Sequence, residues 1–279
     1  MRKVVAFLCF YVFSPYLSAA AEVNPEVLEL YRLSGIQKQI EQYSDMTKAA
    51  LSSGNQPATM NAEEIKEIGK LFDKVFAPQA LQPVVVGFLQ NNLDSSDIKK
   101  VLEWLRSPAG RRITQVEEAR SSAQGYQDMM DYANGLASNP PPQDYLKKMQ
   151  DLATNINLFE STVNISLNAQ LALMTAVAAA TSPEFNERQF NQLADQLQAL
   201  KPAMAEKVSQ MAMLGLLYTY NDMAAADLDP YIAFNATPAA RNYNAAAVSA
   251  LNEALIQASK QLGFELVKLR EDLHGKQKS

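Results

Sequence analysis

Very few side chains in this sequence could serve as a nucleophile, a general base or a metal ligand. It contains one histidine, His274, near the C-terminus, and one cysteine, Cys9, near the N-terminus. A histidine this close to the end of a chain is expected to be a solvated surface residue rather than a catalytic base. Neither the G-x-G-x-x-G nor the G-x-x-x-x-G-K type of phosphate-binding loop occurs. We therefore expect no catalytic residue, no metal site and no cofactor.

Carboxylates occur in adjacent pairs that could in principle share acid–base work. The pairs are Glu63–Glu64, Glu117–Glu118 and Glu271–Asp272. Adjacent residues on a helix point in different directions, so we interpret these pairs as solvated helix faces. Only carboxylates brought together by tertiary packing would support an enzyme.

Methionines offer a second candidate chemistry. Met204, Met211, Met213 and Met223 lie close together in the sequence, and thioethers are suitable ligands for Cu(I). Their spacing and the absence of an accompanying histidine favour the simpler interpretation, that they fill gaps in a helical core.

The most informative pattern is a pair of Ser/Thr-Pro segments. Residues 97–111 (DIKKVLEWLRSPAGR) match residues 227–241 (DLDPYIAFNATPAAR) in physical class, without a gap, at a shift of 130 positions. We interpret the match as a duplicated helical module. The candidate structural or recognition residues are Trp104, Ser107, Pro108, Gly110 and Arg111 in the first segment, and Phe234, Thr237, Pro238 and Arg241 in the second.

These residue types suggest definite roles. In each segment the hydroxyl is expected to cap a helix whose first position is the proline. Arg111 and Arg241 could bind an anion at the start of that helix, but a salt bridge to a neighbouring helix or a solvated charge is the simpler expectation. Trp104 and Phe234 are more simply interpreted as aromatic anchors of the core than as surfaces on which a ligand stacks.

The N-terminus has the pattern of a secretory signal peptide over residues 1–21. Arg2 and Lys3 precede an apolar run, and small residues lead to cleavage after Ala21, with Ala20 as the alternative. The run is shorter than the ~20 residues that span a bilayer. We expect a periplasmic mature protein without disulfides and without a later transmembrane segment. The net charge of −5 argues against nucleic acid as a partner.

The rest of the sequence predicts helices throughout. Apolar residues recur every three or four positions, and period-two alternation is absent. Asn24-Pro25 and Ser182-Pro183 are further expected helix starts. The apolar pattern from Leu146 to Val163 predicts one long helix that continues into an alanine-rich stretch. The fold class is therefore all-α.

A run of three prolines after Asn139 is the best internal boundary. It predicts a first helical module over residues 24–136, a connector over 137–142 and a second, similar module over 143–270. Residues 271–279 are expected to form a basic tail. We expect the two modules to pack together.

The first Ser-Pro segment resembles a bacterial family known as domain of unknown function 2059. Residues 104–112 (WLRSPAGRR) match its pattern of an aromatic helix, Ser-Pro, a small residue, Gly and basic residues. Residues 234–241 (FNATPAAR) form a second copy that lacks the glycine and one of the two adjacent arginines. The resemblance implies an exported helical protein but does not imply any particular activity.

Three functions are compatible with these features. The leading hypothesis is a non-enzymatic binding or interaction protein of the bacterial envelope, whose partner is an unknown envelope protein. The alternative is a carrier of an apolar ligand such as a lipid, which would need an internal cavity. An enzyme of unrecognised type is the third. Two stretches are rich in alanine, Leu171–Ala180 and Ala245–Ala254. We expect their small side chains to allow tight packing between helices; the alternative is that they leave an apolar cleft.

Overall fold

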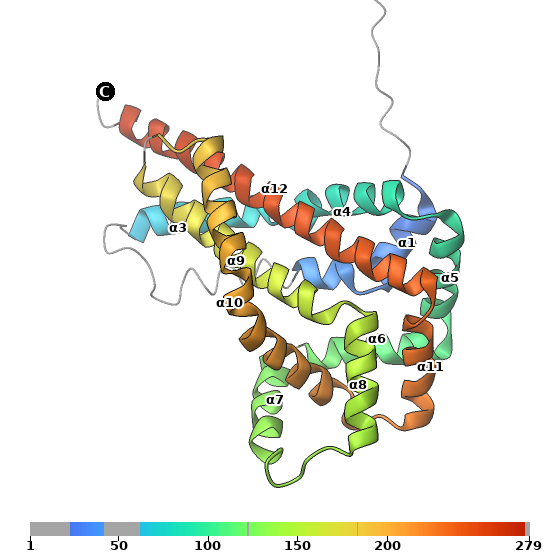
Figure 1. Cartoon of the computed structure of the whole chain (residues 1–279). Coiled ribbons are helices and arrows are strands. Elements are labelled where there is room, and N and C mark those ends of the chain that lie inside the picture. Colours follow the sequence, from blue (N-terminus) through green and yellow to red (C-terminus); the bar gives the residue numbers. More distant parts are fainter. Residues whose placement is uncertain (1–22, 42–61, 122, 183, 277–279) are drawn as a thin grey trace, which may run out of the picture.

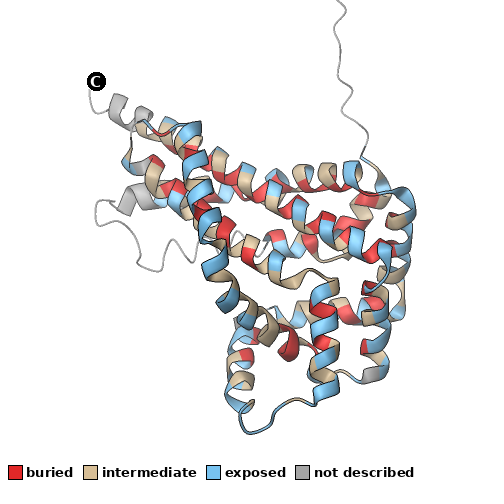
Figure 2. Cartoon of the chain, viewed as in Figure 1, coloured by how far each residue is buried: buried red, intermediate tan, exposed pale blue. Residues whose placement is uncertain are grey.

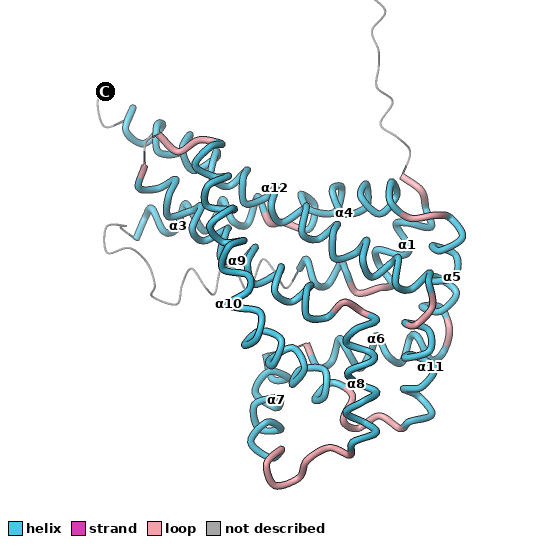
Figure 3. The backbone as a smooth tube through the Cα atoms, in the orientation of Figure 1, coloured by secondary structure: helices cyan, strands magenta, loops and turns pink. Residues whose placement is uncertain are grey.

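The computed structural model describes residues 23–41, 62–121, 123–182 and 184–276. Within these ranges every regular element is a helix and no strand occurs (Figures 1 and 3). The prediction of an all-α fold is confirmed. The expected signal peptide, residues 1–21, lies outside the described residues.

Besides a helical segment at residues 36–41, the described residues form a series of helices with short connections from α3 onward. They are α1 (Pro25–Leu33), α3 (Ala62–Val75), α4 (Pro78–Asn92), α5 (Ser95–Arg106), α6 (Pro108–Arg120), α7 (Ala123–Gly135), α8 (Gln143–Asn155), α9 (Leu158–Thr181), α10 (Glu187–Thr219), α11 (Ala225–Asn235) and α12 (Pro238–Lys276).

Side-chain caps fix several of the helix starts. Asn24 accepts a hydrogen bond from the Glu26 amide at 2.9 Å, and Pro25 opens α1. Pro108 opens α6 and Pro238 opens α12, as the Ser/Thr-Pro segments predict. A capping oxygen satisfies an amide that the first helical turn leaves unpaired, while proline has no amide to satisfy there.

Two expected helix boundaries are wrong. Ser182-Pro183 does not open a helix: Ser182 ends α9, and α10 begins at Glu187 behind a capping box formed by Asn186 and Gln189. The helix expected to run through Leu146–Val163 breaks at Asn157, whose φ of 55° is left-handed. Asparagine tolerates this conformation, and it lies in the two-residue connection between α8 and α9.

The helices enclose two hydrophobic cores (Figure 2). The upper core, named for its place in Figure 1, lies among α1, α3, α4, α5, α9, α12 and the first half of α10, and includes Leu30, Phe72 and Leu167. The lower core lies among α6, α8, α11 and the end of α10, and includes Ile113 and Leu152. Helix α10 joins the two because its two halves contact different cores.

Each core contains residues from both predicted modules. Residues 137–142 do form the loop between α7 and α8, yet the upper core combines α1 and α4 with α9 and α12. The division into modules at this loop stays a prediction. The expected basic tail is helical over most of its length, since α12 continues to Lys276.

Helix α9 bears on the expectation that no later segment crosses a membrane. Its segment Leu158–Ala179 has 22 residues and a mean hydropathy of 1.2, so by length and composition it could cross a bilayer. In the structure 44% of this window is buried, and α9 packs against α10 and α12. A helix in the core of a protein passes the same test, and the packing of α9 fits that interpretation.

The alanine-rich stretches take part in this packing. Ala172 and Ala176 of α9 are buried in the upper core together with Ala250 and Ala254 of α12. Small side chains allow two helices to approach closely. These buried alanines agree with the expectation that the alanine-rich stretches pack tightly between helices.

Candidate functional site

The two Ser/Thr-Pro segments fold into the same hydrogen-bonded turn. The Ser107 amide donates to the Trp104 carbonyl at 2.9 Å, and the Thr237 amide donates to the Phe234 carbonyl at the same distance. The Ser107 hydroxyl then accepts from the Gly110 amide at 3.0 Å, as Thr237 accepts from the Ala240 amide at 3.2 Å. Equivalent residues thus make equivalent bonds.

The two turns also pack against each other. The rings of Trp104 and Phe234 stack with centroids 4.7 Å apart and planes 9° from parallel. Aromatic residues at corresponding positions form this contact, so each segment provides half of it.

Polar contacts beside this stack are reciprocal as well. Arg112 donates to Asp227 at 2.5 Å, and Asn242 donates to Asp97 at 2.8 Å. Positions 112 and 242, like 97 and 227, correspond at the shift of 130. The segments therefore contact each other much as two subunits related by a two-fold axis do.

Gly110 marks the main backbone difference between the two turns. A Cβ at this position would lie 2.2 Å from the Trp104 carbonyl oxygen, which is far inside van der Waals contact. Ala240 occupies the equivalent position with its methyl group fully buried. The second turn therefore accommodates a side chain that the first turn excludes.

The predicted arginines face solvent. Arg111 and Arg241 are both exposed, and neither makes an ion pair within the described part of the chain. The polar contacts between the segments come instead from the next residues, Arg112 and Asn242.

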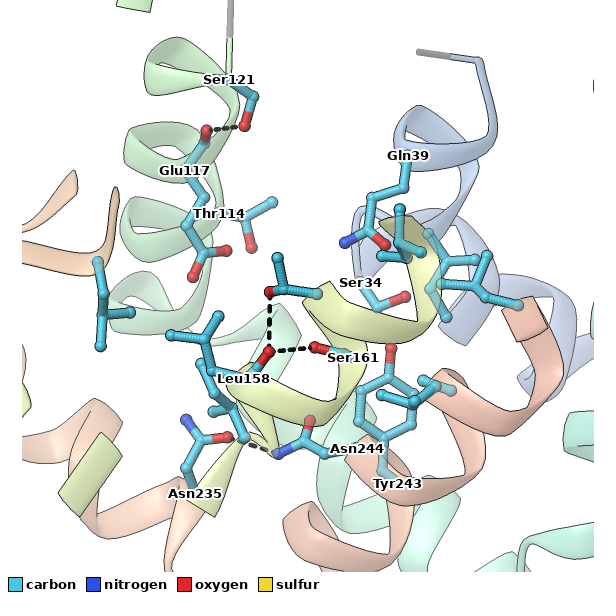
Figure 4. A pocket seen from close by; sticks show the side chains of 18 of the residues that line it. Ser34, Gln39, Thr114, Glu117, Ser121, Leu158, Ser161, Asn235, Tyr243 and Asn244 are labelled. Carbon is cyan, nitrogen blue, oxygen red and sulfur yellow. Dashed lines mark hydrogen bonds between the residues drawn. The ribbon is translucent and has the colours of Figure 1, made fainter. Parts of the chain in front are cut away.

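A cavity of about 580 Å³ lies between the upper and lower cores (Figure 4). Both segments line it, and they do so with equivalent positions. The matched pairs, in the segments and in the helices that follow them, are Val101 and Tyr231, Trp104 and Phe234, Leu105 and Asn235, Ile113 and Tyr243, Thr114 and Asn244, Glu117 and Ala247, and Ser121 and Leu251. Helix α9 and the residues after α1 complete the wall, through Ser161 and Ser34 among others.

Three of the residues predicted for recognition line this cavity: Trp104, Gly110 and Phe234. The capping residues and prolines instead hold the helix starts, and the two arginines lie outside the lining. The motif therefore divides into residues that build the turn and residues that face the cavity.

Glu117 is the only charged side chain in the described lining of this cavity. Its Oε1 accepts hydrogen bonds from the hydroxyls of Tyr220, at 2.5 Å, and Tyr231, at 3.0 Å. Its Oε2 accepts none among the described residues, and Figure 4 shows the carboxyl group directed toward the space between α6 and α9. One oxygen is therefore held in place while the other is open to a ligand.

Burial controls the protonation of this cluster. Loss of hydration raises the pKa of Glu117, the two tyrosine hydrogen bonds oppose that rise, and the neighbouring charge of Glu118 adds to it. Burial and the Glu117 carboxylate raise the pKa of Tyr220 and of Tyr231 well above the usual value, so both phenols remain protonated hydrogen-bond donors.

Aromatic rings extend from this cluster along one side of the cavity. The Tyr220 and Tyr231 ring centroids are 5.9 Å apart, and Tyr231 stacks against Trp104 at 6.1 Å. Together with Phe234 they form a continuous aromatic wall beside the carboxyl group.

Four amide side chains in the lining are paired with one another. Asn244 donates to Asn235 at 3.0 Å, and Asn168 donates to Asn252 at 2.7 Å. The Ser34 hydroxyl, which also lines the cavity, has no hydrogen-bond partner among the described residues, and Glu117 Oε2 is the charged acceptor left in the lining.

The interpretation of Glu117–Glu118 as a solvated pair is wrong for its first member. Gly110, Ile113 and Glu117 are spaced by three and four residues, so they share one helix face, and the first two are buried. That spacing was the signal in the sequence that could have placed Glu117 inside the protein.

The methionines lie apart in two environments. Met204 packs against the upper core, Met213 and Met223 pack against the lower core, and Met211 is 41% exposed. No group of three or more histidine, cysteine or acidic side chains that could hold a metal ion occurs among the described residues.

Residues 79–138 match a family described as an uncharacterized protein conserved in bacteria, DUF2059. The match covers the first Ser-Pro segment and Glu117, so the resemblance of that segment is confirmed; the second segment lies outside the matched residues. No curated protein and no solved structure matches the chain.

Proposed function

We propose that this protein binds a small, largely apolar molecule in the cavity between the upper and lower cores, without chemically transforming it. The observation that carries the proposal is the cavity itself. Its volume of about 580 Å³ falls within the ~300–1,000 Å³ of typical small-molecule sites. A cavity of this size favours the carrier of an apolar ligand over a protein that acts only through its outer surface.

The composition of the walls supports a ligand with a large apolar part. The aromatic wall of Trp104, Tyr231 and Phe234 offers flat apolar surface, and burial of apolar area stabilises a complex by ~25 cal/mol per Å². The small residues Ala247 and Gly215 also face the cavity, and their size leaves space that larger side chains would fill.

The proposal includes an origin and a place of action. A duplication of one helical module would account for the equivalent turns and the matched lining positions of the two segments. Export to the bacterial periplasm is supported by the signal-like pattern of residues 1–21, so the ligand would be a molecule of the envelope.

Trp104 provides a direct test because it is the only tryptophan and it lines the cavity. Decanol added to the mature protein should shift the emission of Trp104 in a saturable manner with a one-to-one stoichiometry. An Ala247→Phe variant should bind at least about tenfold more weakly, since the new ring occupies the cavity.

Ala199→Phe is the matched control, because Ala199 is exposed on α10 and the same ring there leaves the cavity unchanged. Thermal unfolding monitored by circular dichroism would verify that both variants are folded. Equal decanol binding by the two variants, or no saturable binding by the parent protein, would overturn the proposal.

A further inference from the structure

We infer that the ligand is an apolar amine, bound as a cation whose ammonium group pairs with the open carboxylate oxygen of Glu117. The inference rests on the proposed function, because it specifies the head group of the molecule that fills the same cavity. Four observations support it, and each concerns a different part of the site.

The geometry of the carboxyl group is the first. Tyr220 and Tyr231 both donate to Oε1, which orients the carboxyl plane and leaves Oε2 without a donor among the described residues. Two donated hydrogen bonds stabilise the ionised form of a carboxylate. An ammonium group carries donors that Oε2 can accept, and such charge-assisted hydrogen bonds are stronger than neutral ones.

The balance of charge around Glu117 is the second. The titratable groups that face it are Tyr220 after α10, Tyr231 of α11, Tyr243 of α12 and Glu118 of its own helix. None of these is a cation. Loss of hydration raises the pKa of Glu117 despite the two tyrosine hydrogen bonds, and no cation in the described lining opposes that rise.

Lysine is present close by, but it is directed elsewhere. Lys38 pairs with Glu118 at 2.6 Å, and no lysine, arginine or histidine belongs to the described lining of the cavity. The counterion that an ionised Glu117 requires would therefore be supplied by the ligand.

The aromatic wall is the third observation. Tyr231 donates a hydrogen bond to Glu117 and its ring stacks on Trp104, so two electron-rich rings lie close to the carboxyl group. Aromatic faces attract cations, by ~0.5–1 kcal/mol at exposed sites and by more where water is excluded. A neutral or anionic head group would gain nothing from this attraction.

The fourth observation is a second hollow of about 480 Å³ that adjoins the cavity. The two share Asn164, Val248 and Asn252 in their walls. Its charged residues are Glu160, which pairs with Lys201 at 3.4 Å, and Glu253. Lys201 offsets the charge of Glu160, so Glu253 gives the hollow beside the cavity a negative sign that favours a cation.

The test compares three probes with the same apolar chain and different heads: decylammonium, decanol and decanoate. Calorimetric titration of the mature protein near neutral pH, below the critical micelle concentration of each probe, would measure their dissociation constants. We expect decylammonium to bind at least about tenfold more tightly than decanol, and decanoate to bind most weakly.

Glu117→Gln keeps the shape of the side chain and removes its charge. In this variant the preference for decylammonium over decanol should disappear, through an approximately tenfold loss of decylammonium affinity, while decanol affinity changes by less than about twofold. Glu118→Gln is the matched control, since it removes the adjacent charge and should leave the preference intact. Retained decanol binding verifies that the Glu117→Gln variant is folded.

The outcomes separate this inference from the proposed function. If all three probes bind equally, or decanoate binds best, the cavity binds an apolar molecule and the assignment of an amine is wrong. If Glu118→Gln abolishes the preference and Glu117→Gln does not, the inference also fails. If none of the probes binds, both the inference and the proposed function are contradicted.

Discussion

The two Ser/Thr-Pro segments share a turn but differ in what they present to the cavity. Ser107 and Thr237 make the same capping bonds, whereas Glu117, in the helix that follows the first turn, corresponds to Ala247 in the helix that follows the second. Both positions line the cavity. The comparison shows that the residues common to the segments build the scaffold, and that the chemistry of the site comes from a position where they differ.

This difference is consistent with a site built on a symmetric scaffold. Two acids at positions 117 and 247 would place like charges in one cavity, and each would raise the pKa of the other. With an acid at position 117 and an alanine at position 247, the cavity has one charged end and free space at the other position. A ligand with one charged end and an apolar body fits that asymmetry.

The largest expected effect concerns the aromatic stack at the centre of the comparison. Trp104→Ala and Phe234→Ala should each lower the free energy of unfolding by about 3 kcal/mol, since both remove a large packed ring. The double variant should lose about 1 kcal/mol less than the sum, because the rings contact each other. Urea unfolding followed by circular dichroism would measure this coupling; strict additivity would show that the stack contributes no coupling energy.

The next effect separates the backbones of the two turns. Gly110→Ala should destabilise the protein by about 2 kcal/mol, because its Cβ would lie 2.2 Å from a carbonyl oxygen and the turn would have to shift. The reverse change in the other turn, Ala240→Gly, should cost only about 1 kcal/mol, through lost helix propensity. Equal losses of stability from the two substitutions would mean that both turns leave the same space for a Cβ at this position.

A third prediction uses pH to separate Glu117 from its neighbour. Because burial raises its pKa in the folded state, the folded protein holds a proton that the unfolded chain releases. The unfolding free energy should therefore fall as the pH rises above the ordinary carboxyl value of 4.5 and through the raised pKa. Glu117→Gln should remove this fall, so that the variant gains stability relative to the parent with increasing pH.

Denaturant titrations at a series of pH values would measure that difference, with Glu118→Gln as the control. A stability difference between the Glu117→Gln variant and the parent that does not change with pH would indicate that the pKa of Glu117 is the same in the folded and unfolded states.

The smallest effect concerns the reciprocal polar contacts. Arg112→Ala should cost about 0.5 kcal/mol or less, because the Arg112 and Asp227 side chains are 57% and 36% exposed. Salt should reduce this cost, whereas the cost of Asn242→Ala should be insensitive to salt because that contact involves a neutral amide. A loss above about 2 kcal/mol for either would give these contacts a larger role than the exposed geometry allows.

Local sequence patterns predicted the parts of the fold that depend on local physics. The helix starts at Pro25, Pro108 and Pro238 follow from a capping side chain and a proline, both adjacent in sequence. The break at Asn157 was missed because a single left-handed residue interrupts an otherwise continuous apolar pattern.

The cavity depends on packing between distant elements, which spacing along the chain does not specify. The shift of 130 residues correctly identified positions in equivalent turns, yet it gave no reason for Trp104 and Phe234 to contact each other. Glu117 was interpreted as solvated because its partners, Tyr220 and Tyr231, lie more than 100 residues away. Only the tertiary fold brings these hydroxyls to the carboxylate.

Native mass spectrometry of the protein purified from its own host tests the central claim most directly, since it reads the occupancy of the cavity without a chosen probe. We predict one small adduct per chain, released in positive-ion mode as an amine and absent from the Ala247→Phe variant. A chain that is bare in the parent protein, or an adduct retained equally by Ala247→Phe, would contradict ligand binding between the two cores.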